Sequence, residues 1–388
     1  MTLLRDRGLV EISGTAQSQF LLRHQLTDRG RARAMEALNQ SAYVGPAPVT
    51  LEDYYFRVEA QSIANERIDL GNLKKALADL VLPSRLLRQL GPAVNSGKAV
   101  FLYGPSGNGK TSVAERLGAV FRQTIYIPHA LKVDQQVIKV YDQAVHRRVQ
   151  SESQPEEEHE QILDRSAVHD PRWVACHRPV LLAGGELTLS MLDLDCDPLA
   201  KFYEAPLQVK STGGVLVIDD FGRQLVKPED LLNRWIVPLE RKVDYLTLHT
   251  GKKFAIPFDA IVVFSTNLSP AQLMDAAFLR RINYKIRIGA PTVEEFGEIF
   301  RRLCELFGIK YSEKIVSFLV SDFYEKHGIR LAAVHPKLII EHSKAAAKFY
   351  GWEPRLTHEL IEEAVENLAE RIQSSSASDP PVQKIPIG

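Results

Sequence analysis

Short apolar runs and helical segments alternate through the middle of the chain. The apolar runs span 99–103, 215–218 and 260–264, and their length predicts strands buried in a parallel sheet. Between the first two runs, residues 112–121 place apolar side chains on one face of a helix. Strands that alternate with helices predict an α/β core, in which the sheet lies between two layers of helices.

The pattern becomes helical throughout after residue 290. Thr292 and Glu295 have the spacing of a capping box, which predicts a helix that closes near Gly308. Further amphipathic segments follow at 312–327, 336–350 and 357–373. We therefore expect an all-α domain after the core.

Strand patterns also occur outside the core. Residues 7–12 and 20–26 predict strands joined by a polar loop, and a helix is expected to start at Thr27. Residues 243–248 and 253–257 alternate around a Thr-Gly turn, which predicts a β-hairpin. A helix is expected over 50–68.

The chain is expected to divide into five parts: an N-terminal segment (1–42), a linker with that helix (43–69), the core (70–290), the helical domain (291–373) and a disordered tail (374–388).

The composition permits a soluble globular protein with a large core, since 45% of the 388 residues are hydrophobic and 25% are charged. Lys plus Arg and Asp plus Glu are both 48, so net charge gives no attraction to nucleic acid or a membrane. No apolar stretch reaches the roughly 18 residues of a membrane helix, and no secretory pattern follows the first residue, so no membrane insertion is expected. The 3 scattered cysteines fit a reducing cytoplasm.

The run 99–103 leads directly into GPSGNGKT at 104–111, and a helix follows. This spacing between a strand and a helix is typical of a phosphate-binding loop. The backbone N–H groups of such a loop surround phosphate, its lysine reaches the terminal phosphates, and its hydroxyl ligates Mg²⁺. The predicted nucleotide site therefore comprises Gly104, Pro105, Ser106, Gly107, Asn108, Gly109, Lys110 and Thr111.

Polar residues follow the other two apolar runs. Asp219 and Asp220 end the run 215–218, and Asn267 follows 260–264 closely. Because ligands bind at the carboxyl ends of parallel strands, we expect Asp219 to hold Mg²⁺ and Asp220 to polarise an attacking water. Asn267 is expected either to hold that water and sense the γ-phosphate or to act only as a turn former.

The stretch 124–212 contains no catalytic motif of its own. Its acidic run at 151–160 predicts a mobile loop, and Gly184 with Gly185 predicts either a hairpin that faces a pore or a plain turn. Four histidines lack metal-ligand spacing and are expected at the surface: His146, His159, His169 and His177.

Taken together, the motifs resemble those of the AAA+ ATPases. GPSGNGKT is similar to their Walker A, VLVIDD at 215–220 to Walker B, and VVFSTN at 262–267 to sensor 1. The predicted hairpin resembles the pre-sensor-1 hairpin of one branch of that family, and the helices after residue 290 resemble its lid. The N-terminal strands and helix resemble part of a winged-helix domain.

The resemblance implies a P-loop three-layer αβα core with a helical lid, ATP and Mg²⁺ as ligands, and hydrolysis at the subunit interfaces of a homo-oligomeric ring. It implies that Arg280 or Arg281, before an expected strand at 284–288, acts as an arginine finger. Lys337 lies where the family often has its sensor 2 arginine, with Arg330 as a second candidate and a solvated lysine as the alternative. Asp220 departs from the glutamate that is usual in Walker B.

These observations leave two functions open. The first is a ring-forming remodelling or assembly ATPase that acts on a protein client. The second is a slowly hydrolysing nucleotide switch or scaffold. The basic cluster Arg23, Arg29, Arg31 and Arg33 of the winged-helix-like segment is interpreted either as a contact to DNA phosphates or as a solvated or protein-docking surface.

Overall fold

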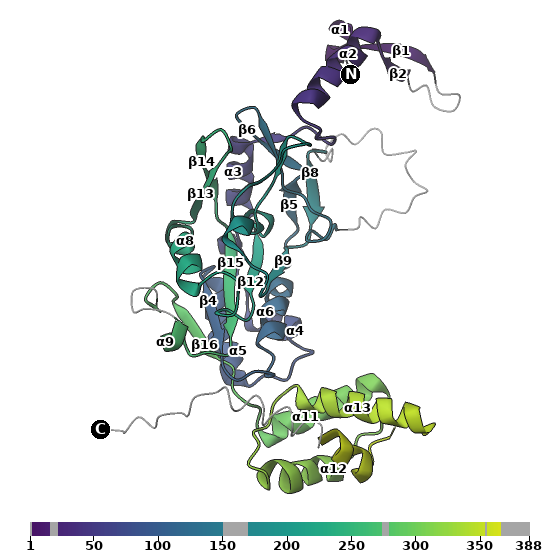
Figure 1. Cartoon of the computed structure of the whole chain (residues 1–388), viewed down its shortest axis with the longest axis vertical. Helices are drawn as coiled ribbons and strands as arrows, with labels where there is room; N and C mark the ends of the chain where they lie inside the picture. Colours follow the sequence, from purple (N-terminus) through teal and green to yellow (C-terminus); the bar gives the residue numbers. More distant parts are fainter. Residues whose placement is uncertain (1, 16–21, 150–169, 274–278, 354, 366–388) are drawn as a thin grey trace.

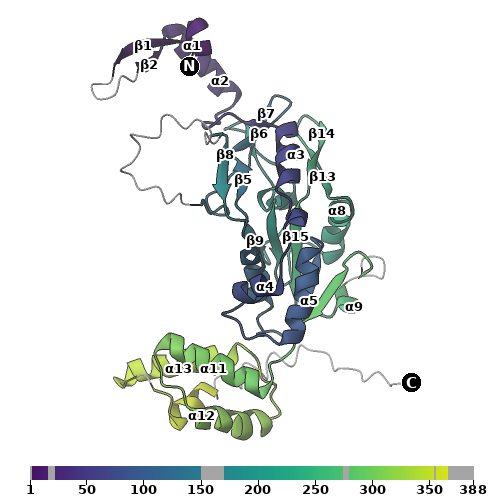
Figure 2. The ribbon, with the colours of Figure 1, turned by 180° about the vertical axis from the view of Figure 1, so that it is seen from behind.

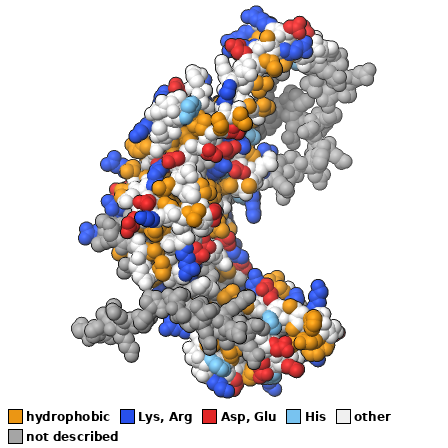
Figure 3. Space-filling model, viewed as in Figure 1, with side chains coloured by type: hydrophobic (Ala, Val, Ile, Leu, Met, Phe, Trp, Pro, Cys, Tyr) orange, Lys and Arg blue, Asp and Glu red, His pale blue; other side chains and the backbone are white. Residues whose placement is uncertain are grey.

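The computed structural model describes residues 2–15, 22–149, 170–273, 279–353 and 355–365. The N-terminal segment lies at one end of the long axis, the sheets of the core lie in the middle, and the helical domain lies at the other end (Figure 1). The opposite view gives the same order (Figure 2), and the space-filling view shows the whole as a crescent (Figure 3). The acidic run 151–160 and the tail 374–388 lie outside the described residues.

A parallel sheet forms the centre of the core. Its order is β16-β4-β15-β12-β9, and each neighbouring pair runs parallel. The strands span Tyr284–Arg287 (β16), Val100–Tyr103 (β4), Ala260–Thr266 (β15), Gly214–Ile218 (β12) and Val180–Ala183 (β9). The first four confirm predicted strands. β9 is an additional strand, and the Gly184-Gly185 pair that follows it is a turn at its end and not a hairpin tip.

Alternate strand residues face opposite layers of helices, as the period of a strand requires. Val100, Leu102, Val215 and Val217 belong to a core with the helices on one face. Those helices are α4 (Leu70–Ala76), α5 (Ser84–Asn95) and α6 (Lys110–Arg116), which continues as the turn Leu117–Val120. Phe101, Leu216 and Ile218 pack on the other face, against α8 (Pro228–Arg241). The three-layer αβα core is therefore confirmed.

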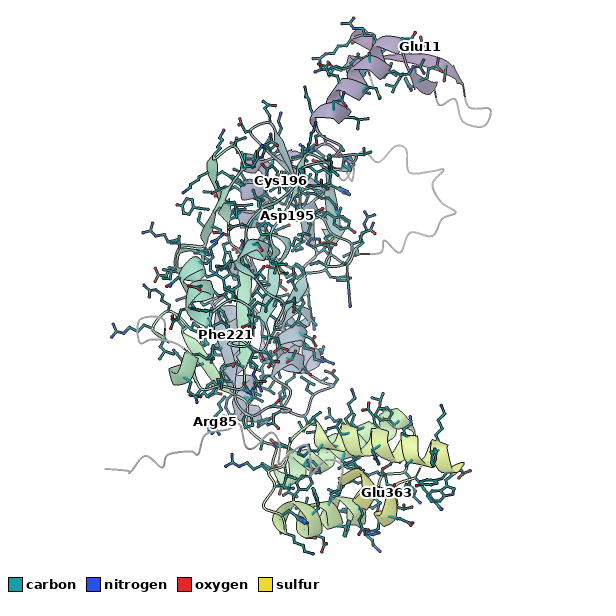
Figure 4. All side chains as sticks on the ribbon, in the orientation of Figure 1. Glu11, Arg85, Asp195, Cys196, Phe221 and Glu363 are labelled. Atoms are coloured by element: carbon teal, nitrogen blue, oxygen red, sulfur yellow. The ribbon has the colours of Figure 1, made fainter. Side chains whose placement is uncertain are left out.

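A second sheet lies beyond the amino ends of the parallel strands, with the order β10-β11-β7-β6-β3. It shares one apolar core with α3, with the antiparallel strand pair β5-β8 and with the hairpin β13-β14. The bounds are Val49–Thr50 (β3), Leu51–Ala60 (α3), Ile125–Pro128 (β5), Ala130–Val133 (β6), Gln136–Lys139 (β7), Trp173–Cys176 (β8), Asp195–Asp197 (β10), Phe202–Glu204 (β11), Leu207–Lys210 (α7), Val243–Thr247 (β13) and Lys253–Pro257 (β14). The hairpin predicted at 243–257 is confirmed. Asp195 and Cys196 mark this sheet in Figure 4.

Two expectations for this region are wrong. The helix expected over 50–68 ends at Ala60, because the Gln61 side chain bonds Tyr126 and the Asp259 carboxylate accepts hydrogen bonds from Ser62 and Ile63. His146 is buried, and its Nδ1 accepts a 2.9 Å hydrogen bond from the Asp142 N–H. Burial lowers the pKa of His146. His177 is exposed, as expected, and His159 and His169 lie outside the described residues.

The chain after residue 291 forms helices around a core of its own. They are α11 (Val293–Phe307), α12 (Glu313–Phe318) with the π-type turn Leu319–Glu325, α13 (His335–Tyr350) and residues 358–365. Thr292 and Glu295 form the predicted capping box, and Gly308 closes α11 in the left-handed region. The all-α domain is confirmed over the described residues.

The N-terminal segment contains α1 (Thr2–Asp6), β1 (Val10–Thr15), β2 (Leu22–Leu26) and α2 (Asp28–Gln40). The two strands pair antiparallel, and Thr27 caps α2, so the predicted strands and helix are confirmed. Glu11 marks β1 at the tip of the molecule (Figure 4). Within the described part of the chain, no helix is both long and apolar enough to cross a bilayer.

Replacing Trp235 by alanine should destabilise the core by about 3–5 kcal/mol, because it opens a large cavity between α8 and the sheet. Trp235 is fully buried, and its ring centroid lies 6.0 Å from that of Phe264. Denaturant unfolding followed by circular dichroism measures the effect. Val237→Ala on the same helix is the control, since Val237 is 36% exposed and should change stability by less than about 0.5 kcal/mol. Equal losses in both variants would contradict this packing of α8.

Candidate functional site

The loop 104–111 joins β4 to α6 through left-handed glycines. Gly104 has φ +140°, and a Cβ there would lie 2.0 Å from the Ile288 carbonyl oxygen. Gly109 has φ +84° and forms the N-cap of α6. Only glycine adopts this backbone without strain. The glycines therefore produce the tight strand-to-helix turn that the motif predicts.

The Lys110 ammonium lies against the backbone of its own loop. Its Nζ donates to the carbonyl oxygens of Gly104 and Pro105, each at 2.9 Å, and the residue is 8% exposed. Burial lowers the pKa of Lys110, while the Asp220 and Asp219 carboxylates act to raise it. A buried cation whose hydrogen bonds go to neutral carbonyls is poised to accept an anion in their place.

Thr111 and Asp219 bring α6 and β12 together. The Thr111 Oγ1 lies 3.0 Å and 2.9 Å from the two carboxylate oxygens of Asp219, so the hydroxyl donates to that carboxylate. Mg²⁺ prefers such oxygen ligands and usually takes only one or two carboxylates, with phosphate and water completing its shell. The described residues contain no group of three or more His, Cys, Asp and Glu that could hold a metal. The oxygen atoms of Thr111 and Asp219 therefore fit Mg²⁺ that arrives with phosphate.

Asp220 lies in the turn that follows β12. It is exposed and has φ +48°, a left-handed conformation that is uncommon for residues other than glycine. The next residue, Phe221, donates its N–H to the Ser265 carbonyl at 2.8 Å and accepts a 2.7 Å hydrogen bond from the Thr266 hydroxyl. Phe221 points into the core (Figure 4). The turn that carries Asp220 is thus fixed to the end of β15.

Asn267 follows β15 on the strand next to β4. Thr266 pairs with Tyr103 in the register of these strands, and the next residues along the chain are Asn267 and Gly104. Asn267 is half-buried, and no hydrogen bond joins its side chain to the described residues. Its position at the sheet edge therefore matches the prediction, and its role stays a prediction.

The helical domain is hydrogen-bonded directly to the loop 104–111. The buried Asn108 amide accepts from the Ala333 N–H at 3.1 Å, and the Val334 N–H donates to the Gly107 carbonyl at 2.9 Å. A Cβ on Gly107 would lie 2.7 Å from the Val334 Cγ1. The segment before α13 therefore packs on the loop itself.

The two sensor 2 candidates lie on either side of that segment. Lys337 is exposed on α13, with its amine 3.8 Å from Glu341, and Arg330 is also exposed. Asn108 joins the core to the helical domain through its hydrogen bond with Ala333, whereas the motif indicated it only as a loop residue. That position is variable in the motif, so no sequence signal distinguished it.

Arg280 and Arg281 line a hollow of about 490 Å³ with Lys98, Glu240 and Asn283. Because Lys98 lies at the amino end of β4, the hollow is at the opposite end of the strand from the loop 104–111. The Arg281 Nε donates to Glu240 at 2.6 Å, whereas Arg280 is exposed. The arginines therefore lie outside the chain's own loop, as predicted.

The helix expected before these arginines, over 270–279, is described as α9 (Pro270–Leu273). Residues 274–278 lie outside the described part of the chain. The expected helix is therefore confirmed only at its start.

A family profile described as a domain of unknown function (DUF8689) matches residues 292–367, the helical domain alone. No curated protein matches the chain. Among solved structures, NtrX from Brucella abortus in complex with ADP is 15% identical over 76% of this chain and 57% of its own, with a TM-score of 0.44. The chain thus spans less than two thirds of NtrX.

A second solved structure is the Holliday junction branch migration motor RuvB from Thermotoga maritima. It is 14% identical over 79% of this chain and 73% of its own, with a TM-score of 0.38. Both TM-scores are below 0.5, so neither similarity assigns a function to this chain.

Stability of the helical domain should fall as the pH drops from about 6.5 toward 4. His335, next to Val334, is 7% exposed, and its Nδ1 lies 3.0 Å from the Tyr324 hydroxyl. Burial lowers the pKa of His335 from 6.5 to about 4, so the unfolded chain binds the proton more readily than the folded one. The stabilisation is full above the unfolded pKa and is lost as the pH falls through the folded pKa.

Denaturant midpoints measured across this pH range test the expectation. His335→Gln should flatten the pH dependence, whereas His358→Gln, an exposed histidine of the same domain, should leave it unchanged. A pH dependence that survives His335→Gln intact would assign it to other groups.

Proposed function

We propose that the chain is an AAA+ protein that binds ATP with Mg²⁺ and hydrolyses it. The observation that carries this proposal is the convergence of Lys110, Thr111, Asp219 and Asp220 from two separate strands on one edge of a parallel sheet. Left-handed glycines at 104 and 109, which shape the loop, support it further. Three free thiols agree with a protein of the cytoplasm.

In this proposal, the loop backbone and Lys110 bind the phosphates. Lys110 exchanges the Gly104 and Pro105 carbonyls for phosphate oxygens, which are stronger acceptors because they are charged. Mg²⁺ held by Thr111 and Asp219 would neutralise charge on the β- and γ-phosphates. Asp220 accepts a proton from the attacking water, and Asn267 helps to orient that water.

Lys110→Ala should weaken ATP binding about 10- to 100-fold, because a charge-assisted hydrogen bond contributes about 1.5–3 kcal/mol. Equilibrium titration with a fluorescent ATP analogue measures the change. Lys132→Ala removes an exposed lysine of the second sheet and is the matched control. Unchanged affinity in the Lys110 variant would contradict the assignment of the loop.

We further propose that hydrolysis occurs at the subunit interfaces of a homo-oligomeric ring, with Arg280 as the arginine that completes a neighbour's site. Arg281 is engaged by Glu240, which favours a structural role for it. Arg280 is exposed at the edge of the domain, away from its own loop. A side chain in that position reaches a second copy more readily than its own nucleotide.

Arg280→Ala should leave ATP affinity nearly intact and slow turnover about 10³-fold or more, because an arginine finger stabilises charge that develops in the transition state. Mixing this variant with Lys110→Ala should restore part of the activity, since mixed rings contain sites with an intact loop and an intact neighbouring arginine. Arg281→Ala is the comparison and should slow turnover less. If neither arginine variant slows hydrolysis, or mixing restores nothing where rings form, the shared site is refuted.

A nucleotide switch or scaffold is the second candidate. The hydrogen bonds from residues 333 and 334 to the loop favour it, because they connect nucleotide occupancy to the helical domain. The short Asp220 carboxylate also favours slow hydrolysis. ATPase rate measured against protein concentration separates the candidates, since a shared site gains specific activity on assembly.

For the N-terminal segment, we favour the solvated surface over DNA binding. Arg31 pairs with Asp28 at 3.1 Å and Arg33 with Glu36 at 2.5 Å, so acidic neighbours offset half of the basic cluster. A protein client is proposed only as a class, because no described site identifies it.

A further inference from the structure

The turn after β12 has an unusual backbone at two positions. Asp220 has φ +48° and Gly222 has φ +99°. A residue other than glycine in this region is strained and persists only where its surroundings hold it. The structure must therefore contain contacts that keep Asp220 in place.

The Gln224 side chain supplies such a contact by bridging the turn. Its Nε2 donates to the Asp219 carbonyl at 2.6 Å, and its Oε1 accepts from the Gly222 N–H at 2.8 Å. One planar amide thus joins the residue before Asp220 to the residue two positions after it. Both groups of the amide are used, so an alkyl side chain cannot replace it.

Packing on the far side prevents the turn from relaxing. A Cβ on Gly222 would lie 2.5 Å from the Leu273 Cδ2, and the left-handed backbone at this position also excludes most other residues. Phe221 is held by Ser265 and Thr266, as described above. The Gln224 amide is bonded to residues on both sides of Asp220, namely Asp219 and Gly222. It therefore joins the turn to the end of β12.

We infer that Gln224 is the positioning residue for Asp220: its amide holds the left-handed turn that presents the carboxylate at the phosphate end of the sheet. The inference rests on the proposed ATP hydrolysis. It also accounts for aspartate in place of glutamate, because Asp and Asn enter the left-handed region several times more readily than other side chains.

Gln224→Ala tests the inference in the full chain. We expect kcat for ATP to fall about 10- to 100-fold, since a small misplacement of a catalytic group has effects of that order. KM and ATP affinity should stay within about threefold, because the Gln224 amide bonds the backbone of Asp219 and Gly222 and not the loop 104–111 or Lys110.

A matched control separates positioning from general destabilisation. The Gln61 amide bonds the N–H and carbonyl of Tyr126 in β5 at 2.9 Å and 3.0 Å, which is a comparable double contact outside the parallel sheet. Gln61→Ala should lower the melting temperature about as much as Gln224→Ala and keep the parent kcat. If Gln224→Ala lowers the melting temperature far more than Gln61→Ala does, the kinetics are measured on Gln224→Met instead, because methionine keeps the side-chain length.

A double-mutant cycle with Asp220→Asn provides the decisive readout. Asparagine keeps the left-handed preference but removes the carboxylate, so most of the turnover should be lost and ATP binding retained. In that background, Gln224→Ala should slow the residual turnover no further, because a residue that acts only through Asp220 has nothing left to position.

Each other outcome overturns the inference in a recognisable way. Equal slowing by Gln224→Ala in both backgrounds would mean that Gln224 acts independently of Asp220. A parent kcat in Gln224→Ala, with binding lost in Lys110→Ala, would refute the inference and leave the proposed function standing. A wild-type chain that neither binds nor hydrolyses ATP would refute both.

Discussion

The register of three parallel strands is the constraint on which the candidate site depends. Tyr103 of β4 pairs with Thr266 of β15, and Ile218 of β12 pairs with Phe264. These pairings bring the loop 104–111, Asn267 and the two aspartates to one edge, although they are far apart in the chain. No strand contains the whole candidate site. A change that shifts the strand register would therefore move the aspartates away from Lys110 and Thr111, even though none of these residues is itself substituted.

The same edge also joins the core to the helical domain. The loop 104–111 accepts hydrogen bonds from the N–H groups of Ala333 and Val334, through its Asn108 amide and its Gly107 carbonyl. Lys110 meanwhile binds the carbonyls of Gly104 and Pro105. A ligand that draws Lys110 away therefore changes the hydrogen bonding of the loop that carries the helical domain. In the proposed function, this short segment would couple nucleotide binding to the helical domain directly.

Local signals predicted much of the fold, and contacts distant in sequence account for most of the rest. The glycine spacing of the loop, the apolar strand before Asp219 and the capping box at Thr292 each depend on neighbouring residues, and each is present. The second sheet was not predicted, because its strands have two to four residues and are drawn from 49–204. The burial of His146 depends on Lys210, whose carbonyl its Nε2 contacts at 2.8 Å.

Asp220 illustrates how backbone and chemistry limit each other at such a site. By sequence alone it is a shortened substitute for glutamate and suggests weaker catalysis. In the structure, β12 ends in a left-handed turn that a longer side chain enters less readily, and Gln224, Ser265 and Thr266 hold that turn. The shorter carboxylate is therefore the residue that suits this backbone. If Asp220 acts on water as proposed, the short reach of its carboxylate makes the fixed turn essential, so the groups around Asp220 matter as much as the carboxylate itself.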